Sequence, residues 1–161
     1  MEVLFNLIQG FHIATEPLNL LFCFLGVLIG TLIGVLPGIG PTATVALLLP
    51  ITFSVPPVSA IILLSGVYYG SMYGGSTTSI LVNLPGESAS IVTCLDGYQM
   101  ARKGRAGAAL GISAFGSFIA GSLGVVGLMM LAPVLGKAAL SIGPAEYFSL
   151  TVFGLTLVTV L

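Results

Sequence analysis

Two stretches of the sequence share a pattern of residues that can bind an anion without any charged side chain. Residues 36–44 and residues 84–93 each place Leu-Pro-Gly after an apolar run and hydroxyl residues soon after it. Proline removes a backbone donor and glycine permits unusual dihedral angles, so each stretch ends one helix and lets another begin. A helix start presents unpaired N–H groups and the positive end of a dipole, which together attract a carboxylate.

A third stretch, residues 70–79, is dense in glycine and hydroxyl residues and carries no charge. It predicts another interruption between Gly70 and Ser76. Ser76 or Thr77 is then the expected N-cap of a short helix that runs to Leu84.

The three interruptions predict one site for an anion. We expect residues 37–44 and residues 74–78 to meet near the middle of a membrane, where backbone N–H groups and hydroxyls replace Lys and Arg. The predicted substrate-binding residues are Gly38, Gly40, Pro41, Thr42, Thr44, Gly74, Gly75, Ser76, Thr77, Thr78, Asn83, Gly86 and Ser88. Carbonyl groups released before the interruptions are expected to hold a coupling Na⁺ transiently, near Leu36, Tyr73 and Leu84.

The composition places these stretches in lipid. Hydrophobic residues make up 57% of the 161 residues and charged residues only 6%, against about a quarter charged in soluble domains. Residues 17–86, 106–136 and 147–161 contain no Asp, Glu, Lys or Arg. A spanning helix needs about 20 apolar residues, so these runs hold several spans.

The elements needed to position the site follow from these runs. Residues 18–36 can cross a bilayer, and glycine recurs at every fourth position from Gly26 to Gly38, which favours close contact with a neighbouring helix. Residues 42–52 predict a helix too short to cross. Residues 107–133 and 144–161 predict two further spans, the first rich in glycine and serine that we expect to make close helix contacts.

The predicted fold class is therefore an all-α integral membrane protein. It is a multi-pass helical bundle with discontinuous or re-entrant helices, broken between Pro37 and Pro41, between Gly70 and Ser76, and at Pro85–Gly86. Residues 1–161 form a single transmembrane domain, which begins with a short interfacial helix over residues 1–16.

Charged residues outside the apolar runs predict the orientation. Arg102, Lys103 and Arg105 lie in one short loop, which the positive-inside rule places in the cytoplasm. Lys137 then lies on the opposite side. Asp96 and the glycine after it predict a turn near the cytoplasmic surface.

Other function classes find little support. The net charge of −1 leaves no basic patch for nucleic acid. Catalysis needs a nucleophile with a base, paired carboxylates or metal ligands, yet the single histidine, His12, lies near the N-terminus, and Glu87 and Asp96 match no metal motif. Glu87 is expected to be a partner of a helix dipole. We therefore expect no enzyme activity, cofactor or bound metal apart from the coupling ion.

Four motifs also carry a family resemblance. Residues 34–43, 69–81, 83–87 and 96–104 resemble the large permease subunit, of the TctA type, of tripartite tricarboxylate transporters. The similarity runs from about Pro17 to the end of the sequence.

The resemblance implies a secondary transporter in the inner membrane of a bacterium. Such systems take up citrate-like carboxylates with a Na⁺ or H⁺ gradient, together with a periplasmic solute-binding protein and a small membrane subunit. Family permeases are several times longer and contain a second related half, so this chain is expected to be the first part of a longer permease. Two alternatives are a non-transporting structural membrane subunit and an anion channel.

Overall fold

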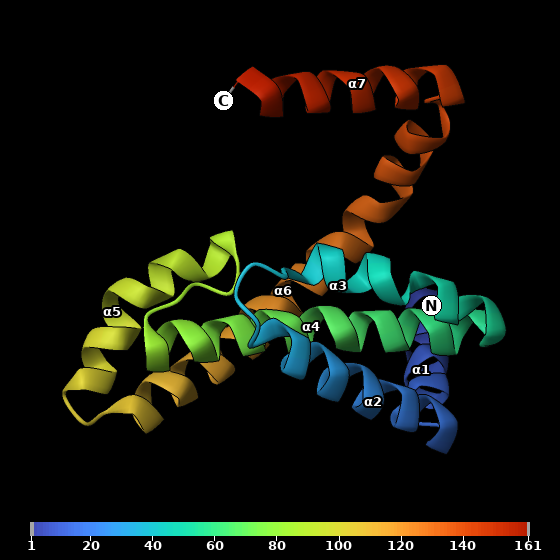
Figure 1. Ribbon diagram of the computed structural model, residues 1–161. Coiled ribbons are helices and arrows are strands. Elements are labelled where there is room, and N and C mark those ends of the chain that lie inside the picture. Colours follow the sequence, from blue (N-terminus) through green and yellow to red (C-terminus); the bar gives the residue numbers. More distant parts are fainter. Residues whose placement is uncertain (1, 161) are drawn as a thin grey trace. The chain divides into compact units, whose positions relative to one another are not determined.

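A computed structural model describes residues 2–160, and this part of the chain contains helices and their connections without strands (Figure 1). The predicted all-α membrane fold is confirmed. Two helical stretches are long and apolar enough to cross a membrane, Pro17–Gly34 and Ala106–Ala132, and a bent pair, Val134–Leu140 with Pro144–Leu157, can form a third. The chain divides into two compact units, residues 1–115 and residues 116–161.

The first unit is built around two helices that run side by side in the same direction, α2 (Pro17–Gly34) and α4 (Pro57–Val82) (Figure 1). Gly26 of α2 faces Leu63 of α4, and Gly34 faces Ser71, so both numbers rise together along the contact. Between α2 and α4 in the sequence, α3 (Pro41–Leu48) and the 3₁₀ helix η1 (Leu49–Ser54) return the chain from the end of α2 to the start of α4. This return segment contains the predicted short helix, and at about 24 Å it is too short to cross a bilayer.

Glycines on both helices allow the close contact. Gly26, Gly30 and Gly34 face the backbone of α4, as their spacing predicts, and Gly66, Gly70 and Gly74 face the backbone of α2 in return. A Cβ atom on Gly66 would lie 2.9 Å from the carbonyl oxygen of Cys23. Helices can therefore pack backbone to backbone only while these positions lack side chains.

A buried polar link fastens the same helices near their starts. The Ser59 hydroxyl donates to the Asn19 Oδ1 at 2.6 Å, and the Asn19 Nδ2 donates to the Ile13 carbonyl at 2.8 Å. The latter bond ties α2 to the predicted N-terminal helix, α1 (Glu2–Ala14). Because these buried groups satisfy one another, they fix the register of the two helices without an unpaired polar atom.

The prediction of an interruption between Gly70 and Ser76 is wrong, because α4 continues through this segment to Val82. The hydroxyls in this segment bond to carbonyls one turn earlier in the helix. Thr77 donates to Tyr73 at 2.9 Å, and Ser79 donates to Gly75 at 2.8 Å. Such back-bonding lets a hydroxyl-rich segment remain helical in a membrane. The expected helix start at Ser76 or Thr77 is therefore absent.

The other two interruptions are confirmed. The first separates α2 from α3, where Gly38 has a φ of 92° that favours glycine and Pro41 opens the new helix. The second follows α4, which ends at Asn83 in the left-handed conformation. Asn tolerates that conformation better than most residues, so it ends the helix as a C-terminal glycine would.

After the second interruption, η2 (Ser88–Ser90) leads into α5 (Ile91–Arg102). The turn predicted at Asp96 and Gly97 is wrong, because both residues lie inside α5. Gly97 is instead a packing position: a Cβ atom there would lie 2.7 Å from the Cγ1 of Ile80 in α4. This contact holds α5 against the end of α4.

The helix α6 (Ala106–Leu140) begins in the first unit and continues into the second, where α7 (Pro144–Val160) follows. Both occupy the predicted spans. A Cβ atom on Gly111, Gly116, Gly124 or Gly127 would meet nothing within 4 Å, so the close contacts predicted for these four glycines of α6 are not made among the described residues.

Candidate functional site

The two confirmed interruptions meet each other beside α4. The Gly38 N–H donates to the Gly86 carbonyl at 3.2 Å, which joins the first connection to the second. Gly86 is buried against α4, and a Cβ atom on it would lie 2.5 Å from the Cα of Gly75 and 2.9 Å from the carbonyl oxygen of Gly34. The second connection can therefore approach the helix pair this closely only because residue 86 lacks a side chain.

A pocket of about 600 Å³ lies where these segments meet. Its walls come from the first connection and the start of α3, from one face of α4, and from the second connection with η2 and the start of α5. The lining residues are Gly38, Gly40, Pro41, Thr42, Tyr68, Met72, Pro85, Gly86, Glu87, Ser88, Ala89 and Ile91.

The start of α3 supplies hydrogen-bond donors to this pocket. Gly40 is the N-cap in extended conformation, and no side chain caps the helix. Pro41 has no N–H to lose, while the N–H groups of Thr42 and Ala43 belong to the first turn and have no partner within the helix. The positive end of the α3 dipole and the exposed Thr42 hydroxyl therefore favour an anion here.

Glu87 brings a carboxyl group into the same pocket. It is the N-cap residue of η2: the Glu87 N–H donates to the Ser90 hydroxyl at 3.2 Å, and the Glu87 main-chain carbonyl accepts from the Ser90 N–H at 3.2 Å. This confirms the expected role of Glu87 at a helix start. Glu87 lies in the connection outside the spanning helices, and desolvation by burial raises the pKa of its carboxyl above the ordinary value.

The structure brings together six of the predicted substrate-binding residues in this pocket. They are Gly38, Gly40, Pro41, Thr42, Gly86 and Ser88. Every one belongs to a confirmed interruption, so these two patterns in the sequence were sufficient to locate them.

The other predicted residues lie outside the pocket lining. Thr44 is fully buried and donates to the Gly40 carbonyl at 3.0 Å. Thr78 donates to Gly74 at 3.1 Å and to the released carbonyl of Val35 at 3.2 Å, which ties the end of α2 to α4. Asn83 ends α4. Gly74 and Gly75 are packing positions, and Ser76 and Thr77 are half-buried on α4.

The predicted cation ligands differ in their surroundings. The Tyr73 carbonyl was expected to be released by a helix break, which is wrong, because it lies inside α4 and accepts from Thr77. The Leu36 carbonyl lies in the first connection and accepts from the Ile39 N–H at 3.4 Å. Leu84 lies in the second connection. Binding of Na⁺ near Leu36 and Leu84 stays a prediction.

Sequence reasoning missed the α4 wall of the pocket and its carboxyl group. Tyr68 and Met72 are four residues apart and so share one face of α4. The signal for this face was present in the sequence, since Gly66, Gly70 and Gly74 have the same four-residue spacing and indicate a continuous helix. Read as a helix, the segment places its glycines toward α2 and residues 68 and 72 on another face.

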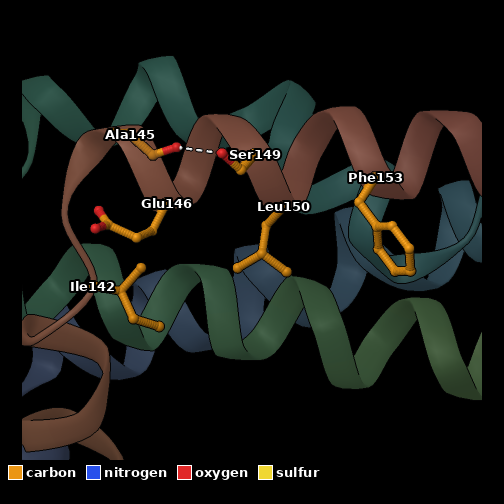
Figure 2. A pocket seen from close by; sticks show the side chains of 6 residues that line it. All are labelled: Ile142, Ala145, Glu146, Ser149, Leu150 and Phe153. Atoms are coloured by element: carbon orange, nitrogen blue, oxygen red, sulfur yellow. Dashed lines mark hydrogen bonds between the residues drawn. The ribbon is translucent and has the colours of Figure 1, made fainter.

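A second hollow, of about 460 Å³, lies along α7 in residues 116–161 (Figure 2). It is lined by Ile142, Ala145, Glu146, Ser149, Leu150 and Phe153. All six come from α7 and the turn before it. The Ser149 hydroxyl donates a hydrogen bond to the Ala145 carbonyl at 2.9 Å, so it is already paired within the helix. A single helix face with one carboxylate has no converging donors, so it is a poorer candidate for an anion site.

Comparison with known families decides the identity of the chain. Residues 20–161 match the family described as "Tripartite tricarboxylate transporter TctA family". The chain belongs to the TctA family. The match includes α2, both interruptions and every residue that lines the pocket beside α4.

One curated relative extends the comparison. The chain is 61% identical over 155 residues to an uncharacterized 52.8 kDa protein in the TAR-I ttuC' 3' region of Agrobacterium vitis. The alignment covers 96% of this chain and 31% of that protein, so the chain spans about a third of its relative's length. No solved structure matches the chain. As a member of the TctA family, the chain is a component of a membrane transporter.

Proposed function

We propose that this chain is the N-terminal part of a permease that takes up tricarboxylates or related carboxylates by secondary transport. The observation that carries the proposal is the pocket formed where two broken helices meet, in a chain of a transporter family. Secondary transporters hold substrates and coupling ions at such discontinuous helices. The driving force is a Na⁺ or H⁺ gradient.

The carboxylate is held by neutral donors, because no Lys or Arg occurs among the lining residues. Thr42 and Ser88 supply hydroxyls, and the start of α3 supplies N–H groups. Gly38, Gly40 and Gly86 let the backbone approach the substrate closely. The predicted residues outside the lining act indirectly, by fixing the positions of the two connections.

The whole transporter includes further parts. A periplasmic solute-binding protein delivers the substrate, a small membrane subunit completes the complex, and the permease lies as a multi-pass protein in the inner membrane of a bacterium. The family's tripartite name supports this arrangement.

The test compares hydroxyls inside and outside the pocket in a full-length permease that contains this sequence. Thr42→Ala and Ser88→Ala should each weaken citrate binding about tenfold to a hundredfold, because a hydrogen bond to a charged group contributes about 1.5–3 kcal/mol. Thr77→Ala is the matched control, since its hydroxyl bonds to Tyr73 outside the lining. The measurement is equilibrium binding of citrate by calorimetry.

Unchanged affinity in both pocket variants, at wild-type expression, would contradict the proposed site. Citrate flux that continues without an ion gradient would favour a channel.

A further inference from the structure

The proposed anion site contains a feature that opposes anion binding. Glu87 is the one carboxylate among the lining residues, and it shares the pocket with the donors of α3 and the Ser88 hydroxyl. Two carboxylates in one partly buried site repel each other, and such pairs commonly bind a proton between them. A site built only to attract anions has no use for this group.

Glu87 lies close to α3 and to α4. A Cβ atom on Gly40 would lie 3.9 Å from the Glu87 Cβ, and one on Gly75 would lie 3.8 Å from both its Cγ and its Oε1. The Glu87 main chain is held at the start of η2, where its N–H donates to the Ser90 hydroxyl at 3.2 Å. The carboxyl group therefore lies in the pocket on the side of α4, close to the Cα of Gly75.

The other ionisable groups near this pocket do not substitute for Glu87. Tyr68 of α4 is the second ionisable side chain in the lining, and it is 44% exposed. The first connection and the start of α3 contribute no ionisable side chain, and neither does α2 in residues 17–34. On α5, Asp96 is exposed and outside the lining.

We propose that the Glu87 carboxylate binds one proton from water when the carboxylate substrate enters the pocket, and loses it when the substrate leaves. This inference rests on the proposed function and assigns its coupling ion and the residue that carries it. In the protonated form, the new O–H can donate to the substrate. The proton thus removes a repulsive charge and adds a donor. The raised pKa of Glu87 is consistent with this role.

The experiment counts protons taken up with citrate by the full-length permease. Calorimetric titrations at about pH 8, in two buffers of different ionisation enthalpy, give this number. The variant Glu87→Gln mimics the protonated acid and should bind citrate while taking up one proton fewer than wild type. Wild-type affinity should fall about tenfold per pH unit above the pKa of Glu87, and the Glu87→Gln variant should lose this part of the dependence.

Asp96→Asn is the matched control, because it removes a nearby carboxylate that lies outside the pocket, and it should match wild type. The same proton count in wild type and Glu87→Gln overturns the inference, as does citrate binding by wild type without any proton uptake. A wild-type permease that binds neither citrate nor related di- and tricarboxylates refutes the proposed function itself. Where Glu87→Gln does not fold, Glu87→Ala removes the carboxyl group instead, and a pH profile unchanged from wild type overturns the inference, as does a wild-type affinity that does not fall as the pH rises above the pKa of Glu87.

Discussion

Glycine and hydroxyl residues occupy much of the interior of residues 1–115. Val67 and Ile80 are fully buried, but so are Thr44, Ser71 and Ser79. Apolar side chains gain little by leaving lipid for the protein interior, so helices in membranes associate through close packing and hydrogen bonds instead. Most of these buried hydroxyls donate to a backbone carbonyl one turn earlier in the chain, as Ser79 does to Gly75.

Ser71 departs from this rule. Its hydroxyl is the one buried side-chain oxygen or nitrogen in the described part of the chain with no hydrogen-bond partner. Leaving such a group unsatisfied costs about 1–3 kcal/mol. Ser71→Ala should therefore stabilise the detergent-solubilised permease by about 1 kcal/mol in thermal unfolding.

Ser79→Ala provides the comparison, because it removes a satisfied buried hydroxyl. This variant should destabilise the detergent-solubilised permease by about 0.5–1.5 kcal/mol in the same thermal unfolding measurement. Equal losses for the two variants would mean that the Ser71 hydroxyl has a partner in the complete transporter.

At the scale of elements, α2 and α4 show what sequence patterns could and could not predict. The four-residue glycine spacing in α2 was interpreted as a packing face, which is confirmed. The same spacing in α4 was overlooked, because glycine and hydroxyls together are also typical of loops. Proline distinguishes a true helix end from a glycine-rich segment that stays helical. Pro37 and Pro85 follow the confirmed helix ends, whereas the segment from Gly70 to Ser76 contains no proline.

The candidate site follows the same division. Residues next to the two proline breaks were located correctly in the pocket lining, because a break fixes its own neighbours in space. The α4 wall and Glu87 could not be placed in this way. The local pattern accounts for Glu87 as the first residue of a helix, and only the contact between distant segments puts its carboxyl beside Gly75 of α4.

The helix pair leads to a prediction about packing. A Cβ atom on Gly70 would meet the backbone of Val27 and Thr31, so Gly70→Ala should force α2 and α4 apart and lower the unfolding free energy by about 1–3 kcal/mol. Gly111→Ala is the matched control, because nothing lies within 4 Å of a Cβ there. It should be neutral or stabilising by up to about 1 kcal/mol, the helix propensity that alanine adds. A stable Gly70→Ala permease would contradict the close contact.

At the scale of the whole molecule, the orientation in the membrane is still a prediction. Lys103 follows the last turn of α5, and Lys137 lies in the last turn of α6. Impermeant thiol reagents on intact cells should label Lys137→Cys and not Lys103→Cys, in a background without Cys23 and Cys94. Labelling of residue 103 alone would show that the orientation is opposite to the predicted one.

Transport by this chain alone is a separate question. Because the chain spans about a third of its relative, and the family resemblance implies a second related half in the complete permease, we expect no concentrative uptake by the purified chain. Vesicles with an imposed Na⁺ or H⁺ gradient and labelled citrate provide the measurement, with the full-length permease as the positive control. Accumulation of citrate by the short chain would show that it forms a complete site.

The parallel packing of α2 and α4 also sets the timing of biosynthesis. Gly26 requires Leu63 as its neighbour, and 63 minus 26 is 37 residues. At a synthesis rate of about 5–20 residues per second, that neighbour is made roughly 2–7 s later. The glycine row of α2 therefore gains its packing partner only after the return segment has also been made, and slower translation of that segment delays the pairing of the two helices.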